Sequence, residues 1–257
     1  MMNRPIGVFD SGIGGVTVLD KLIEMFPNED FIYLGDTINL PYGTKSKEQL
    51  ESIITGVAEK LIARDVKAIV IACNTATANS MHLSKITDIP IIGVVEPTAK
   101  YSISQSANKK IAVLATNVTI DSGIYQKYIE PEAKGYYIKC SEFVDQIEAS
   151  NIDTPSSHQL VRSKLEHLQN EGIDTVIHGC THFGLYAKEI KAVLPDANQI
   201  SCALPTAMKL AEVLEEKKLR FTGKKVGSVE INVTGDPEVM KPKLNWFTKP
   251  YNGIYKI

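Results

Sequence analysis

Two of the four cysteines stand where a reactive thiol is expected. Cys73 and Cys180 each follow an apolar run directly and precede a segment with helical periodicity. A thiol at the start of a helix ionises more readily, and its thiolate is the reactive form. A buried cysteine is more often a small apolar filler, which is the interpretation we give to Cys140 and Cys202. The chain has no CxxC pair, so we expect neither a zinc ribbon nor a thioredoxin-type site.

The segments around the two candidate cysteines resemble each other. Residues 69–75 and 175–182 both read as a buried strand that ends in a cysteine with hydroxyl-bearing or amide neighbours. Taken alone, either thiol would be assigned as filler. The repeated context favours a function for the pair, and it indicates a weak internal duplication of the chain.

Other polar residues also follow apolar runs. Asp10 could cap a helix or handle a proton beside a thiol. His182 could lie at a helix start or orient Cys180, whereas His178 lies inside a strand and reads as a core histidine. Ligands bind at the carboxyl ends of parallel strands, and helix N-termini bind anions. A pocket for a small anionic ligand is therefore predicted at four clusters: 10–12, 73–75, 115–119 and 180–182.

These clusters need strands and helices to position them. The predicted strands are 5–9, 31–34, 68–72, 91–95, 110–115, 135–140, 175–178, 199–202 and 229–233. The predicted helices are 15–26, 46–64, 74–86, 120–129, 143–149, 158–171, 183–193, 206–216 and one near 237–247. This alternation predicts an α/β fold with mostly parallel sheets. We expect two similar lobes, 1–97 plus about 207–257 and 98–206, with the active site in the cleft between them.

Composition narrows the class of protein. The 28 basic and 30 acidic residues give a net charge of −2, which argues against a broad grip on nucleic acid. The first apolar run is too short for a signal peptide or a membrane span, so we expect a cytoplasmic protein without a membrane partner. The glycines of residues 12–15 do not match a nucleotide-binding motif, and we interpret them as a tight turn at a pocket floor.

The polar clusters resemble the motifs of glutamate racemases. The opening stretch Ile6–Gly15 is similar to the first motif of that family, and the stretches around the two cysteines are similar to its cysteine motifs. The matching blocks keep the family's order along the chain: 6–15, 35–37 with 40–46, 72–78, 93–97, 113–116, 179–182 and 233–236.

The resemblance implies a cofactor-independent enzyme that interconverts L- and D-glutamate, the D-isomer being used for peptidoglycan. It implies that Cys73 and Cys180 are the two bases, that Asp10 and His182 assist them, and that Glu148 is a further candidate. The substrate-binding residues that it implies are Ser11, Pro41, Tyr42, Gly43, Asn74, Thr75, Thr116, Thr119 and Thr181. Backbone N–H groups after Ser11, Asn74 and Thr181 would stabilise the charge on the substrate carboxylate. No metal is implied, glutamate is the expected small-molecule partner, and a homodimer is compatible with the sequence.

Two other functions stay open at this point. The chain could be a racemase of the same superfamily that acts on aspartate or another amino acid, or a small-ligand binding protein without activity. Its sequence departs from the family pattern at residues 141–142, 184 and 200–203.

Overall fold

The chain divides into two compact α/β units. The structure is a computed structural model that describes residues 3–257. Unit 1 comprises the residues up to Val94 together with Ala203–Ile257, and unit 2 comprises Val95–Cys202. The helices that the structure describes include none with the length and the apolar run needed to cross a membrane.

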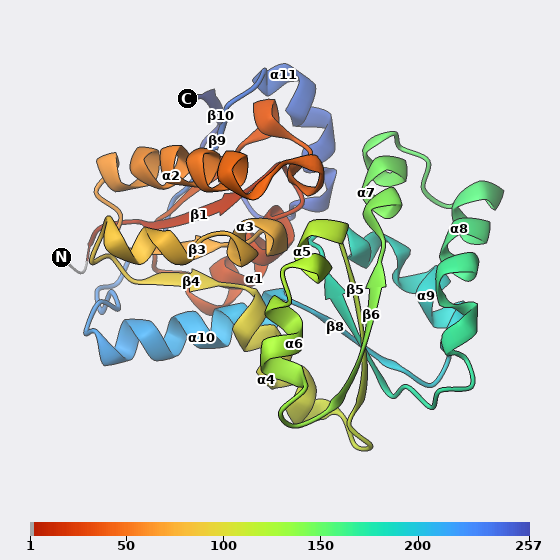
Figure 1. The fold of residues 1–257 in the computed structure, drawn as a ribbon. Helices are drawn as coiled ribbons and strands as arrows, with labels where there is room; N and C mark the ends of the chain where they lie inside the picture. The colour runs from red at the N-terminus through yellow and green to blue at the C-terminus, as the bar shows by residue number, and fades with distance from the viewer. Residues whose placement is uncertain (1–2) are drawn as a thin grey trace. The chain divides into compact units, whose positions relative to one another are not determined.

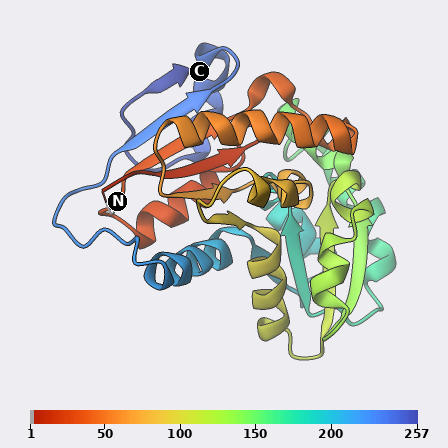
Figure 2. The same cartoon turned by 60° about the vertical axis from the view of Figure 1, so that its left-hand side comes forward.

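Unit 1 is built on a six-stranded sheet in the order β10-β9-β2-β1-β3-β4. Every pair of neighbouring strands in it is parallel, and β1 and β3 are buried along their whole length. Figure 2 shows that the C-terminal strands, in blue, extend the sheet that contains the first strand, in red. The strands are β1 Ile6–Asp10, β2 Phe31–Gly35, β3 Ala68–Ile71, β4 Ile91–Gly93, β9 Val229–Val233 and β10 Ile254–Lys256.

Helices cover this sheet, and local signals set their ends. The second helix begins with a capping box, in which the Ser46 and Gln49 side chains each accept from the other's backbone N–H. Helices α1 and α10 pack against each other, although they come from opposite ends of the chain (Figure 1). The helices of unit 1 are α1 Val16–Met25, α2 Lys47–Ala63, α3 Asn74–Ala78, α10 Ala203–Glu216 and α11 Pro237–Met240.

Unit 2 has a four-stranded parallel sheet in the order β6-β5-β7-β8. Its strands are β5 Lys110–Ala115, β6 Lys134–Lys139, β7 Thr175–Gly179 and β8 Asn198–Ser201. Its helices are α4 Val95–Gln105, α5 Asn117–Asp121, α6 Ile124–Ile129, α7 Ser141–Glu148, α8 Pro155–Leu165 and α9 Ala187–Val193.

The two sheets share one topology. Within unit 1 the first four strands lie in the order second, first, third, fourth, and the four strands of unit 2 repeat that order. Strand β3 thus corresponds to β7, and each is followed within two residues by a candidate thiol, Cys73 or Cys180. The duplication that the sequence indicated is confirmed at the level of strand order.

Several predicted elements are wrong in extent. The helix predicted over 74–86 ends at Ala78, where the Asn79 side chain donates to the Thr75 carbonyl and replaces helix continuation. The helix predicted over 120–129 is split by Gly123, whose φ is 69°. The strand predicted over 91–95 ends at Gly93.

Two elements were missed altogether. Helix α4 begins almost directly after β4. Pro97 lies in its first turn, where a proline is compatible with a helix. The short edge strand β10 was not predicted either.

A buried ion pair lies in the core of unit 1. Lys67, which precedes β3, is 0% exposed and its Nζ lies 2.5 Å from an oxygen of Glu29, which is 4% exposed. Burial lowers the pKa of Lys67, and the hydrogen bond and charge of Glu29 counteract that shift. Glu29 also accepts from the Phe221 backbone N–H at 2.8 Å, so the pair ties the C-terminal segment to the first half of the sheet.

We expect Lys67→Met to lower the free energy of unfolding by about 3–5 kcal/mol, because it leaves the Glu29 carboxylate buried without its cation. Arg4→Gln is the matched control, since it removes an ion pair to the exposed Asp65 and should cost at most about 1 kcal/mol. Urea unfolding followed by circular dichroism gives both values. Equal losses for the two variants would show that the buried pair does not stabilise this unit.

Candidate active site

The thiol of unit 1 lies at the junction between β3 and α3. Cys73 is the residue before the first turn of α3, and its Sγ accepts from the Ala76 backbone N–H at 3.4 Å. The thiol also lies 3.6 Å from Ser11 Oγ, to which it can donate. Cys73 and Ser11 are 7% and 8% exposed. The sulfur therefore has a donor and an acceptor at hand, as a group that gains and loses a proton requires.

Asp10 and the glycines after it form the floor beside this thiol. Asp10 is fully buried, and its carboxylate accepts from the Gly12 backbone N–H at 2.9 Å. This N–H was expected to be available to a substrate carboxylate, and that prediction is wrong because Asp10 already uses it. A Cβ on Gly15 would come within 2.5 Å of Asp10 Cβ and 2.9 Å of the Tyr33 hydroxyl. The glycine is thus required by close packing.

A second carboxylate, Asp36, organises the loop after β2, although it was not among the residues predicted from the sequence. The Tyr42 hydroxyl donates to Asp36 Oδ2 at 2.7 Å, and the Thr234 hydroxyl donates to the other oxygen at 2.8 Å. Burial raises the pKa of Tyr42, and the charges of Asp36, Cys73 and Asp10 raise it further. Tyr42 is therefore neutral, and its hydroxyl proton is held by Asp36. The sequence does contain a signal for Asp36, because it is an aspartate at the end of a buried strand, as Asp10 is.

The remaining predicted residues of unit 1 come from the loop after β2 and from the first turn of α3. Pro41 precedes the short 3₁₀ turn Tyr42–Thr44, which contains Gly43. Asn74 and Thr75 form the first turn of α3 and are 2% and 3% exposed. That turn packs against the segment of Tyr42. The 3₁₀ turn of Tyr42 and the first turn of α3 therefore lie together on the side of unit 1 where Cys73 begins its helix.

The thiol of unit 2 begins a line of proton-handling groups. Cys180 Sγ lies 3.6 Å from His182 Nδ1, and His182 Nε2 lies 2.9 Å from Glu148 Oε1. A carboxylate that accepts from Nε2–H leaves the lone pair of Nδ1 facing the thiol. The imidazole can then take the proton of Cys180, and the carboxylate stabilises the imidazolium that results. His182 is 3% exposed, whereas Cys180 is half-buried.

Thr116 and Thr119 lie at the start of α5, after β5. Their hydroxyl oxygens are 2.9 Å apart, and Thr116 Oγ1 accepts from the Thr119 backbone N–H. In the register of the sheet, Ala115 is opposite Gly179, so one further step places Thr116 opposite Cys180. The same extension from Phe9 and Ile71 places Ser11 opposite Cys73. We call the residues around Cys73 in unit 1 and those around Cys180 in unit 2 the two half-sites. Each half-site thus has a hydroxyl residue opposite its thiol residue in the sheet register. Thr181 follows Cys180 directly.

The other cysteines and His178 are enclosed by the fold. Burial raises the pKa of the Cys140 thiol to about 12, so it stays protonated at neutral pH. Cys202 is 3% exposed. His178 lies within β7 opposite Ser201, its ring contacts the Gln199 side chain at 2.8 Å, and burial lowers its pKa. His178 is thus a neutral core histidine.

Neither half-site has the constellation of a metal centre. Among the residues that the structure describes, no group of three or more His, Cys, Asp or Glu ligand atoms within metal-binding reach includes Cys73 or Cys180. Each half-site holds what acid–base chemistry needs: a thiol and groups that can donate to it or accept from it.

Comparison with known proteins places the chain in a family. Residues 6–208 match the sequence profile of Asp/Glu/Hydantoin racemases. "Glutamate racemase 2" of Caldanaerobacter subterraneus is 39% identical over 245 residues, which cover 94% of this chain and 92% of that protein.

Solved structures of glutamate racemases have a fold similar to that of this chain. The glutamate racemase isoform RacE1 from Bacillus anthracis has a TM-score of 0.94 at 32% identity, covering 100% of this chain and 98% of that one. The glutamate racemase from Francisella tularensis in complex with D-glutamate has a TM-score of 0.91 at 32% identity, with the same coverage.

The parallel α/β units and their similarity to these enzymes define the class of protein as an isomerase. More particularly, the chain belongs to the Asp/Glu/Hydantoin racemase family and is an amino-acid racemase.

We expect Glu148→Gln to slow alkylation of Cys180 at pH 7. The variant removes the carboxylate that accepts from His182 Nε2, and with it the group that keeps the Nδ1 lone pair facing the thiol. Mass spectrometry after timed iodoacetamide treatment gives the rate for each cysteine. The rate at Cys73 in the same sample is the internal control. Unchanged labelling of Cys180 would refute the coupling from Glu148 through His182.

Proposed function

We propose that this protein interconverts L- and D-glutamate without a cofactor, with Cys73 and Cys180 as the two bases. The observation that carries the proposal is the equivalent placement of the two thiols, each just after the third strand of a parallel sheet and opposite a hydroxyl residue. Racemisation must remove the α-proton from one face of the carbon and return a proton to the other. Two thiols that address opposite faces of one substrate carbon meet this requirement.

Each turnover conserves protons and charge. A thiolate on one cysteine takes the α-proton and becomes a thiol, while the thiol of the other cysteine gives its proton to the opposite face and becomes a thiolate. The enzyme is left ready for the reverse direction, and proton exchange with neighbouring groups resets it. His182 with Glu148 serves this exchange at Cys180, and Ser11 with the adjacent Asp10 serves it at Cys73.

The intermediate carries negative charge that spreads from the α-carbon onto the substrate carboxylate. Donors aimed at that carboxylate lower the barrier, because the interaction strengthens as the charge develops. We assign this role to the first turn of α3, at Asn74 and Thr75, and to the segment of Thr181. A single proton-transfer group supplies about 10²–10⁴-fold, so these donors must supply much of the remaining acceleration.

Glutamate is the proposed substrate because the relatives with full coverage are glutamate racemases, and the Francisella enzyme is in complex with D-glutamate. We further propose that the D-glutamate serves peptidoglycan synthesis in the cytoplasm. Chiral chromatography after incubation with glutamate and with aspartate distinguishes this substrate from that of an aspartate racemase. Turnover of either amino acid excludes a binding protein without activity.

We expect Cys73→Ala and Cys180→Ala each to lower the rate of glutamate racemisation at least about 10³-fold in both directions, because each removes the base for one face. Circular dichroism follows the reaction directly, because L- and D-glutamate give signals of opposite sign. Cys140→Ala is the matched control, since it removes a thiol that burial keeps protonated, and its rate should stay within a few-fold of the parent.

Full activity in either Cys73→Ala or Cys180→Ala would refute the two-base assignment. A large loss in Cys140→Ala, with its thermal unfolding unchanged, would show that the wrong thiols had been chosen.

A further inference from the structure

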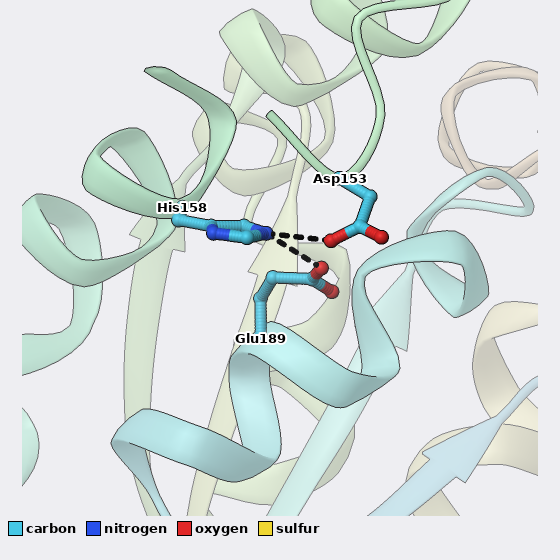
Figure 3. Close-up of side chains that lie close together, drawn as sticks. All are labelled: Asp153, His158 and Glu189. Carbon is cyan, nitrogen blue, oxygen red and sulfur yellow. Dashed lines mark hydrogen bonds and ion pairs between the residues drawn. The ribbon is translucent and has the colours of Figure 1, made fainter. Parts of the chain in front are cut away.

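A histidine and two carboxylates converge in unit 2, apart from the groups assigned to racemisation. His158 Nε2 lies 2.9 Å from Asp153 Oδ1 and 3.4 Å from Glu189 Oε1, and the three ligand atoms lie within 4.8 Å of one another. Figure 3 shows the three side chains pointing toward one another. Asp153 comes from the loop before α8, His158 from the first half of α8, and Glu189 from α9.

The buried carboxylate of Glu189 indicates that this cluster is a binding site. Its side chain is only 8% exposed, and its second oxygen, Oε2, is buried without a hydrogen-bond partner. A buried carboxylate oxygen that lacks a partner costs free energy, and native structures compensate such groups with a ligand, water or ion. His158 engages Oε1, which leaves Oε2 to be explained. A cation bound by both oxygens of this carboxylate would satisfy Oε2 and would lie beside His158 through Oε1.

The donor set and its geometry select the kind of cation. One imidazole nitrogen with two carboxylate oxygens suits a first-row transition metal ion, whereas Ca²⁺ and Mg²⁺ prefer oxygen ligands throughout. Tetrahedral ligands at about 2.0–2.1 Å from such an ion lie about 3.3 Å from each other. The His158–Glu189 separation of 3.4 Å is close to that value, and the exposed Asp153 can adjust its own separation by a rotamer change.

We propose that Asp153, His158 and Glu189 form a binding site for a divalent transition metal ion. The ion replaces the contacts that His158 makes with the two carboxylates, and water completes its coordination. It carries no step of the racemase reaction. Its effect is to join the loop at Asp153 to helices α8 and α9.

This site lies next in sequence to the proton-handling line of unit 2. Glu148 ends α7, and the six-residue connection 149–154 that leads to α8 contains Asp153. Ser150 and Asp153 both have left-handed backbone, with φ values of 60° and 59°. Non-glycine residues in that conformation are costly, so an ion bound at Asp153 would stabilise the connection that follows Glu148.

Co²⁺ titration of the full chain tests the proposal, because a cobalt–thiolate site shows a charge-transfer absorption that a histidine–carboxylate site lacks. We expect one Co²⁺ per chain, bound without that absorption and displaced by Zn²⁺. Glu189→Gln and His158→Gln should weaken the affinity at least tenfold. Asp153→Asn changes an exposed loop residue, so it provides a second variant whose folding is not at risk. His167→Gln, an exposed histidine outside the cluster, should bind as the parent does.

Three results would overturn the proposal: no saturable binding, binding with the thiolate absorption, or equal affinity in the parent, Glu189→Gln and Asp153→Asn. The last of these would leave an ordinary ion pair between His158 and the carboxylates. Binding is measured without substrate, so failure here and failure of the proposed racemase activity are distinguishable.

Discussion

Both half-sites depend on the parallel pairing of two central strands in their sheet, β1 with β3 in unit 1 and β5 with β7 in unit 2. In a parallel sheet the carboxyl ends of neighbouring strands meet at one edge, so whatever follows β1 lies beside whatever follows β3. The register of Phe9 with Ile71 brings the Ser11 hydroxyl to the Cys73 thiol, and that of Ala115 with Gly179 places Thr116 opposite Cys180. A shift of one residue in either pairing would separate hydroxyl from thiol and turn the side chains to the other face.

The two half-sites share this frame but surround their thiols with different chemistry. Cys73 contacts a hydroxyl and a helix N–H, with the Asp10 carboxylate buried nearby. Cys180 contacts an imidazole that is itself held by Glu148. The proposed reaction is symmetric between two enantiomers, yet the groups that accept the proton from each thiol differ. Variants at Glu148 and at Asp10 should therefore change kcat and KM by different factors in the two directions, although kcat/KM stays equal in both because the two enantiomers have the same free energy in water.

Much of this arrangement could be predicted from the sequence, because it depends on local patterns. Buried apolar runs marked the strands, and the small polar residues after them marked the half-sites. The roles that depend on tertiary contacts could not be read in the same way. Asp36 became part of the site only when the Tyr42 and Thr234 side chains, far apart in the sequence, converged on it. Likewise, the sequence does not show that the Gly12 N–H is taken by Asp10, or that Asn79 ends α3.

Deuterium incorporation at the α-carbon during the first turnovers in D₂O tests the two-base account most directly. Starting from unlabelled L-glutamate, the account predicts D-glutamate that carries deuterium at the α-carbon and recovered L-glutamate that carries almost none, because the base that removes the proton differs from the acid that returns one. Starting from D-glutamate, the pattern should be reversed. Product that keeps its original α-hydrogen, or equal deuterium in product and recovered substrate, would contradict the account.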